Sequence, residues 1–227
     1  MQPIIIDVAS APIEGAADYI DIAEPAVPGS YKKAESIAEW IAEERPKLMQ
    51  QAKEKALAHA ALDMDLARLT AVGILEAGKA PVVYLCRDEN DERAAIVWVK
   101  SFQPDYNNTV PLCGYNIFGF DLPLVMRRAR YLGVTFPRLN LDRYRSPHSD
   151  LMLELSDRDP QRRRPLSFYA KRLGMEITKT LSGAEEARVH ETGLWDELAE
   201  SVKHDLVAAG RLAEWLNIID PKKAVAA

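Results

Sequence analysis

The order of strand-like and helix-like segments constrains the fold of this chain most. A short apolar run at residues 3–7 predicts a buried strand that ends on Asp7. Residues 10–33 carry several prolines and glycines, so we expect an irregular excursion there. Residues 34–62 are strongly helical in composition, and Pro46 predicts either a kink in this segment or two separate helices.

Three strand-like runs follow this helical segment. A glycine and a polar turn separate them, which suits an antiparallel meander. A further strand, two helices that each end at a glycine, and a long final helix complete the order. The runs are 66–75, 81–86 and 94–99, the strand is 110–115, and the helices are 121–132, 165–173 and 195–218. This mixed order predicts an α/β fold whose central sheet has an antiparallel three-strand portion extended by parallel strands.

The length of 227 residues suits one domain at 1–220, with a helical insertion at about 30–62 and a flexible tail at 221–227. No stretch approaches the ~20 apolar residues that span a bilayer. The start lacks the cationic and apolar regions of a secretory signal. Cys86 and Cys113 have no metal-type spacing, so we expect two reduced, buried thiols. These features predict a cytoplasmic protein that does not associate with membranes.

Positive charge is concentrated in the middle of the chain, although the net charge is −5. Residues 120–175 carry 12 Lys and Arg against 6 Asp and Glu. A basic strip of this kind could follow a phosphate backbone while the rest of the surface repels it. A solvated helix face plus a loop would have the same composition, so charge alone leaves both interpretations open. The arginines concerned include Arg127, Arg128, Arg130, Arg143, Arg145, Arg162, Arg163 and Arg164.

Three aspartates that are distant in the sequence have settings that could bring them together. Asp7 ends the first strand, Asp121 begins a helix, and Asp205 lies in the amphipathic last helix. Taken singly, they would serve as a turn residue, a helix N-cap and a solvated helix residue. Taken together, they predict a carboxylate cluster assembled by folding, and such clusters bind Mg²⁺ or Mn²⁺.

The segments around these acids resemble the DnaQ-like 3′–5′ exonucleases of the RNase H-like fold, in the branch related to the proofreading domain of family B DNA polymerases. That family opens with a strand carrying Asp-x-Glu, whose aspartate falls here on Asp7. Its second motif, Asn-x-x-x-Phe-Asp, matches Asn116, Phe120 and Asp121 at every specified position. Its third motif is an aspartate in the last helix, which falls on Asp205.

Weaker features extend the resemblance over nearly the whole chain. Residues 31–33, before the long helical segment, are similar to an insertion of that branch. Residues 148–152 are similar to its His-x-Asp-Leu-Met segment, and 166–174 to the helix that follows. Asp150 lies in the second of these segments, where we expect it to form local hydrogen bonds rather than to bind metal.

The resemblance implies hydrolysis of phosphodiester bonds at the 3′ end of single-stranded DNA with two Mg²⁺ or Mn²⁺ ions. It implies that Asp7 bridges both ions, Asp205 binds the first, and Asp121 holds the second through water. It also places Asn116 and Phe120 beside the substrate strand. There an aromatic ring adds ~1–3 kcal/mol of stacking for each base, whatever its sequence.

Two positions depart from the family pattern. Ala9 replaces the glutamate of the first motif, and Ser201 replaces the tyrosine that would orient the attacking water. Three carboxylates against two divalent cations leave a surplus of positive charge, which predicts weaker metal binding. Ser10 is a candidate neutral ligand and substrate contact. His204 is a candidate base, although it lies ~100° around the helix from Asp205.

The sequence therefore leaves three functions open. The leading one is a metal-dependent 3′–5′ exonuclease on single-stranded DNA, impaired by Ala9 and Ser201. The alternative is a catalytically silent DnaQ-like protein that binds nucleic acid or a protein partner. A DnaQ-type ribonuclease is the third, since no feature reads a 2′-hydroxyl. Ala9 fits a deliberate inactivating change and a natural decay of the site equally well.

Overall fold

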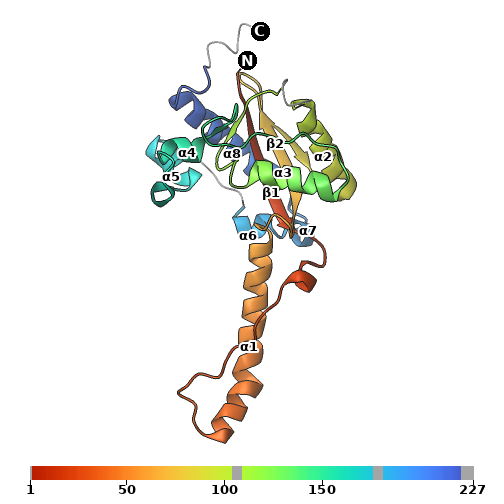
Figure 1. Ribbon diagram of the computed structural model, residues 1–227, viewed down its shortest axis with the longest axis vertical. Coiled ribbons are helices and arrows are strands. Elements are labelled where there is room, and N and C mark those ends of the chain that lie inside the picture. The colour runs from red at the N-terminus through yellow and green to blue at the C-terminus, as the bar shows by residue number, and fades with distance from the viewer. Residues whose placement is uncertain (1, 104–108, 176–180, 221–227) are drawn as a thin grey trace.

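A computed structural model describes residues 2–103, 109–175 and 181–220. It has a five-stranded sheet flanked by helices, and one long helix that projects away from this body (Figure 1). The strands are β1 (Ile4–Pro12), β2 (Ala67–Leu75), β3 (Val82–Leu85), β4 (Leu112–Gly114) and β5 (Ser149–Asp150). The helices are α1 (Ala34–Ala60), α2 (Glu89–Ser101), α3 (Asp121–Tyr131), α4 (Leu151–Leu155), α5 (Leu166–Arg172), α6 (Gly183–Glu186), α7 (Val189–Thr192) and α8 (Trp195–Trp215). Short 3₁₀ helices lie at Ala16–Tyr19 and Pro160–Arg162.

The strand order in the sheet is β3-β2-β1-β4-β5. β2 is antiparallel to both β1 and β3, whereas β4 is parallel to β1 and β5 is parallel to β4. The mixed α/β sheet expected from the sequence is confirmed. Its antiparallel portion consists of β3, β2 and β1, and β4 and β5 extend it in parallel. The order places β1, the strand that carries Asp7, in the middle of the sheet.

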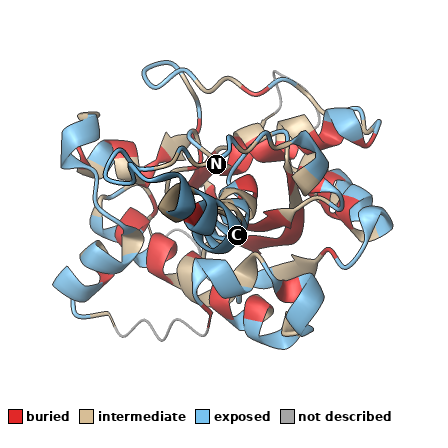
Figure 2. Ribbon diagram, turned by 90° about the horizontal axis from the view of Figure 1, so that it is seen from below, coloured by how far each residue is buried: buried red, intermediate tan, exposed pale blue. Residues whose placement is uncertain are grey.

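β1 is buried on both faces, which explains its continuous apolar sequence. Ile4, Ile6 and Val8 pack with residues of α2 and α3 on one side of the sheet. Ile5 and Ala9 pack with residues of α8 on the other side. Figure 2 shows that the buried residues concentrate in the sheet and on the helix faces that cover it. Because side chains alternate along a strand, Asp7 belongs to the face that α8 covers.

The prediction of a strand at residues 94–99 is wrong, because these residues lie in α2. Asp88 caps this helix, and its side chain accepts hydrogen bonds from the backbone N–H groups of Asn90 and Asp91. The buried residues Ala95, Ile96 and Val99 then fall on one helix face. The third member of the antiparallel portion is therefore β1 rather than this segment.

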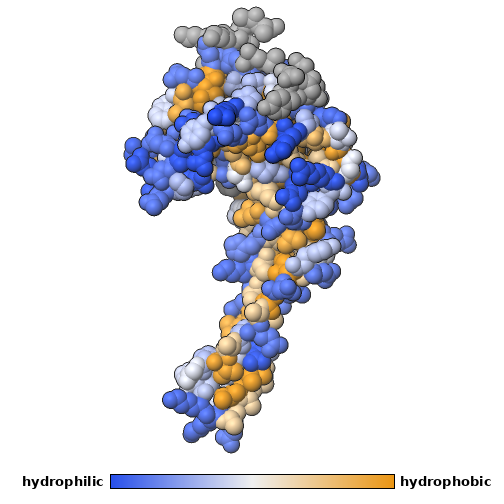
Figure 3. All heavy atoms as spheres, in the orientation of Figure 1, coloured by the Kyte–Doolittle hydropathy of each residue, from blue (hydrophilic) through white to orange (hydrophobic). Residues whose placement is uncertain are grey.

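The expected helical segment is a single helix, α1, that continues through Pro46. The alternative of two separate helices is therefore wrong. Only Trp40 and Ala60 are buried along α1, and the helix projects well beyond the sheet (Figures 1 and 3). Within the described ranges, no helix combines the length and the apolar character needed to cross a membrane.

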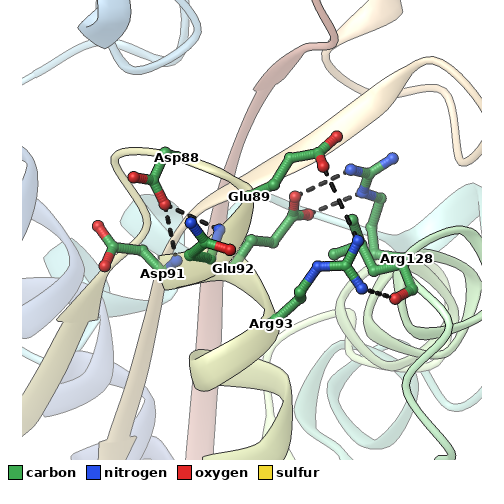
Figure 4. Close-up of polar contacts among 8 residues, drawn as sticks. Asp88, Glu89, Asp91, Glu92, Arg93 and Arg128 are labelled. Atoms are coloured by element: carbon green, nitrogen blue, oxygen red, sulfur yellow. Dashed lines mark hydrogen bonds and ion pairs between the residues drawn. The ribbon is translucent and has the colours of Figure 1, made fainter.

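A buried ion pair joins the helices on the α2 and α3 side of the sheet (Figure 4). Arg128 donates from Nε and from one terminal nitrogen to the two carboxylate oxygens of Glu92, at 2.7 and 2.9 Å. Glu92 also accepts from the backbone N–H of Leu69 in β2. Arg127 pairs with Asp65 nearby. Both arginines have carboxylate partners, so the two do not belong to an open basic strip.

Candidate nucleic-acid and metal site

Asp7 lies where α8 comes closest to the sheet. In the β1–β2 ladder it is paired with Gly73. A Cβ atom added to Gly73 would lie 2.5 Å from Val202 Cγ1 and 2.7 Å from Leu206 Cδ1. This close approach fixes the register of α8 on the sheet, and it brings the turn that carries Asp205 to the level of Asp7. Both aspartates are half-buried.

Asp121 is held against the other edge of β1. β4 ends at Gly114, so β1 continues beyond its parallel neighbour. The backbone N–H of Val8 would be left without a partner there, and it donates to Asp121 Oδ1 at 2.9 Å. Asp121 is the first residue of α3, and its side chain is buried. The second motif is therefore joined to the first through the residue that follows Asp7.

The pKa of the Asp121 carboxyl depends on burial, on the Val8 hydrogen bond and on two other carboxylates. Burial raises the pKa of the Asp121 carboxyl to about 7, and the hydrogen bond from Val8 opposes that rise. The carboxylates of Asp150 and Asp205 raise this pKa further by repulsion. Asp121 and Asp205, which are 84 positions apart in the chain, therefore share one electrostatic environment.

The structure brings these acids to one region but does not by itself form a metal centre. In the described parts of the chain, no group of three or more His, Cys, Asp or Glu side chains is arranged to hold a metal ion. Asp121 and Asp205 offer two carboxyl groups. Burial is the main cause of the raised pKa of Asp121, and repulsion by Asp205 is a smaller contribution that a cation would relieve. The fit to a divalent ion is therefore partial.

The two departures from the family motifs have structural surroundings of their own. Ala9 is buried opposite Ala71 on the face that α8 covers. Ser10 follows a bulge in β1, and its hydroxyl donates to the backbone oxygen of Ala61 at 2.6 Å. The hydroxyl of Ser201 is buried in α8 and donates to Glu186 Oε1 at 2.7 Å. Both hydroxyl hydrogens are thus engaged within the protein.

Asp150 organises the loop that carries Asn116. Its carboxylate accepts from the backbone N–H groups of Asn116 and Phe118, at 3.1 and 2.9 Å. It also caps α4 by accepting from Met152 and Leu153. The expectation that Asp150 forms local hydrogen bonds is confirmed. Burial raises the pKa of this carboxyl, although all four backbone donors favour its charged form.

Asn116 has a left-handed backbone conformation, with φ of 64°. Its side chain lies against Gly119, where an added Cβ atom would be 2.4 Å from Asn116 Oδ1. A side chain at position 119 would therefore displace that amide. Phe120 is half-buried and packs against the apolar cluster on the α3 side of the sheet. Asn116 and Phe120 thus flank the short loop between β4 and Asp121.

A cavity of about 350 Å³ opens beside this loop. Its walls come from three segments of the chain: the loop after β4, residues 141–144, and the region from Asp150 to Arg163. The lining residues are Asn116, Phe118, Gly119, Leu141, Asp142, Arg143, Tyr144, Asp150, Leu153 and Arg163. The sequence indicated Arg143 and Arg163 only as members of a basic strip. It gave no signal that they share a cavity with Asn116.

No protein-family model matches this sequence, and no curated protein shows detectable similarity to it.

Proposed function

We propose that this chain is a metal-dependent 3′–5′ exonuclease of the DnaQ-like, RNase H-like type, acting on single-stranded DNA with reduced activity. One observation carries the proposal. Asp121 is buried against β1 at Val8, and its pKa is raised in part by Asp205. Acids from the first, second and third motifs would converge in this way in such a nuclease. The mixed strand directions around β1 support the same proposal.

The proposed cofactor is Mg²⁺ or Mn²⁺, held by Asp7, Asp121 and Asp205. A divalent ion there would stabilise negative charge on the scissile phosphate and lower the pKa of a bound water. Ala9 supplies no carboxylate to such a site, and Ser201 supplies no phenol to orient water. We therefore expect weaker cation binding and slower hydrolysis than a site with both groups would give.

The remaining residues of the region would act on the substrate strand. Asn116 offers an amide that can accept and donate hydrogen bonds, and Phe120 adds apolar surface beside Asp121. Neither residue distinguishes DNA from RNA, so RNA remains a second substrate class within this proposal. Cys86 and Cys113 are buried and unpaired, which fits a reducing compartment such as the cytoplasm.

A catalytically silent protein that binds nucleic acid or a protein partner is the second candidate. Two observations favour it. Ala9 is buried and leaves no side-chain oxygen at the position of the expected carboxylate. Ser201 is engaged with Glu186 rather than facing solvent. In this reading the fold keeps its acids for structural reasons, such as the hydrogen bond from Val8 to Asp121.

The two candidates separate in an assay of a 5′-labelled single-stranded oligonucleotide with Mn²⁺ or Mg²⁺. We expect slow shortening from the 3′ end by the unaltered chain and faster shortening by the Ala9→Glu variant. Asp121→Asn should abolish it, because the amide keeps an acceptor for Val8 but carries no charge. Asp196→Asn, an exposed position near the start of α8, is the matched control and should retain full activity.

Each remaining outcome favours one candidate. Shortening only after Ala9→Glu would mean an intact framework with an inactivated site. No shortening by either protein, together with retained binding of the strand, would reject the exonuclease and support the silent protein. Equal shortening by Asp121→Asn would show that the activity does not come from this site.

A further inference from the structure

We propose that the cavity beside Asn116 binds one nucleotide unit of a single-stranded nucleic acid, with Arg143 and Arg163 contacting its phosphate. The inference deepens the proposed nuclease function, but it rests on the cavity and can be tested without catalysis. At about 350 Å³, the cavity lies at the small end of the size range for ligand pockets. A single nucleotide is a ligand of that class.

The charge of the cavity favours a phosphate. Within the described residues, neither Arg143 nor Arg163 has a carboxylate within ion-pair distance. Nearby arginines do have carboxylate partners: Arg162 pairs with Asp157 and Asp159, and Arg158 pairs with Glu154. Two arginines in one cavity without carboxylate partners form a site for an anion, and arginine matches the geometry of phosphate oxygens.

Among the described residues, the two acids in the cavity wall form no ion pair with Arg143 or Arg163, and both accept hydrogen bonds from backbone N–H groups. Both oxygens of Asp150 accept backbone hydrogen bonds, including those from Asn116 and Phe118. Asp142 accepts from the backbone N–H groups of Tyr144 and Arg145. Each carboxylate thus has backbone N–H partners, from the loop after β4 for Asp150 and from its own loop for Asp142. The arginine side chains remain available to a ligand.

Two aromatic residues in the wall suit a base. Tyr144 is 74% exposed, and Phe118 lies on the loop after β4. The guanidinium groups of Arg143 and Arg158 lie 5.9 and 5.3 Å from the Tyr144 ring centre. These cation–π contacts help to hold the exposed ring in position. Stacking on an aromatic ring is independent of base identity, as a strand-binding protein without sequence preference requires.

The position of the cavity links it to the candidate acids. Asn116 and Gly119 line it, and Asp121 follows Gly119 by two residues. A strand with one nucleotide in the cavity could therefore continue along this loop to the region of Asp121 and Asp205. The basic strip indicated by the sequence contributes here through Arg143 and Arg163, and not through Arg127 or Arg128.

The test measures binding of a fluorescently labelled ten-nucleotide oligothymidylate by anisotropy, in EDTA so that no metal-dependent cleavage occurs. We expect the Arg143→Gln/Arg163→Gln double variant to weaken binding by about tenfold or more, with a shallower salt dependence. Tyr144→Leu should weaken it by about tenfold, through lost stacking. Arg162→Gln is the matched control, because Arg162 adjoins Arg163 but has carboxylate partners, and its affinity should change less than about twofold.

Thermal melting of every variant checks that each one is folded. The proposal is overturned if the unaltered chain does not bind the oligonucleotide, or if the double variant binds as tightly as the unaltered chain. It is also overturned if Arg162→Gln loses as much affinity as the double variant. Equal binding of a ten-residue polyglutamate would reduce the cavity to a general anion site and reject the nucleotide. Failure of the nuclease assay would leave these binding results unaffected.

Discussion

The two longest helices of this protein are stabilised in different ways. α8 has 21 residues, and nine of them are buried against the sheet and its neighbours. α1 has 27 residues, of which two are buried. The buried positions of α8 include Leu198, Val202 and Leu206, which recur every four residues and form one apolar face. α1 instead relies on alanine-rich composition and on short-range pairs such as Lys47 with Glu44.

Helix formation and helix packing are therefore separate properties of a sequence. A segment can be strongly helical without belonging to the core, because favourable propensity stabilises it residue by residue. A helix that covers a sheet gains most of its stability from the buried face. Substitutions in α8 and its contacts should therefore affect global unfolding, whereas matched substitutions in or beside α1 should not.

The largest difference in unfolding free energy is expected between the variants Leu212→Ala in α8 and Leu48→Ala in α1. Leu212 is fully buried, whereas Leu48 is 39% exposed. Truncation of a buried leucine costs about 2–5 kcal/mol of unfolding free energy, since it removes apolar contacts and leaves a cavity. Leu48→Ala should cost less than about 1 kcal/mol. Urea unfolding of both variants measures this, and equal losses would mean that α1 belongs to the cooperative core.

A smaller contrast is expected between Gly73→Ala and Gly29→Ala. The new methyl group at position 73 would collide with Val202 and Leu206, which should cost about 1–3 kcal/mol. At position 29, in the segment before α1, no atom lies within 4 Å of the added Cβ. That variant should be neutral or slightly stabilised, because alanine reduces the entropy of the unfolded chain. Unchanged stability of Gly73→Ala would show that Val202 and Leu206 lie further than 2.5 and 2.7 Å from the added Cβ.

The smallest contrast concerns acid sensitivity at two histidines. His148 is buried and its Nδ1 accepts from the backbone N–H of Leu112 at 3.0 Å. Burial lowers the pKa of this imidazole to about 4, below its ordinary value of 6.5. The unfolded chain therefore binds the proton more readily between pH 6.5 and 4, and folding stability falls as the pH falls through this window. His148→Asn keeps an acceptor but does not titrate.

The unaltered protein should thus lose about 1–2 kcal/mol more stability than His148→Asn between pH 7 and pH 5. His59→Asn, at an exposed position in α1, is the control and should follow the unaltered protein at both pH values. Denaturant unfolding at the two pH values gives the difference directly. Parallel behaviour of the unaltered protein and His148→Asn would show that this imidazole takes up its proton as readily in the folded state as in the unfolded chain.

Most of the fold could be predicted from the sequence where a pattern was long or ended in a clear signal. The continuous apolar run of β1 is one example, because it predicts a strand that is buried on both faces. The glycines after α3 and α5 are another, since Gly133 and Gly174 both have positive φ. The strand prediction for residues 94–99 was wrong because six consecutive apolar residues fit a strand and a helix equally well. The Asp88 cap decides in favour of the helix, because its side chain accepts from the first backbone N–H groups of α2.

The candidate site could be predicted less completely. The order of Asp7, Asp121 and Asp205 predicted that the three acids would approach one another. The contribution of Asp205 to the pKa of Asp121 concerns two of them, and the convergence of all three stays a prediction. The partners of Ser10 and Ser201 could not be predicted, because Ala61 and Glu186 reach them only through tertiary packing. The cavity could not be predicted either, because its walls come from three separate segments that meet only after the sheet has formed.

The hydrogen bond from Val8 to Asp121 means that one carboxyl group completes the backbone of the central strand where a neighbouring strand stops. Loss of this acid would therefore expose an unpaired amide in the interior, whether or not any substrate is ever cleaved. A descendant of a nuclease that had given up its chemistry would still be under pressure to retain an oxygen acceptor at that place. Retention of this aspartate in such a protein would therefore reflect its structural role in the sheet and would not be evidence of nuclease activity.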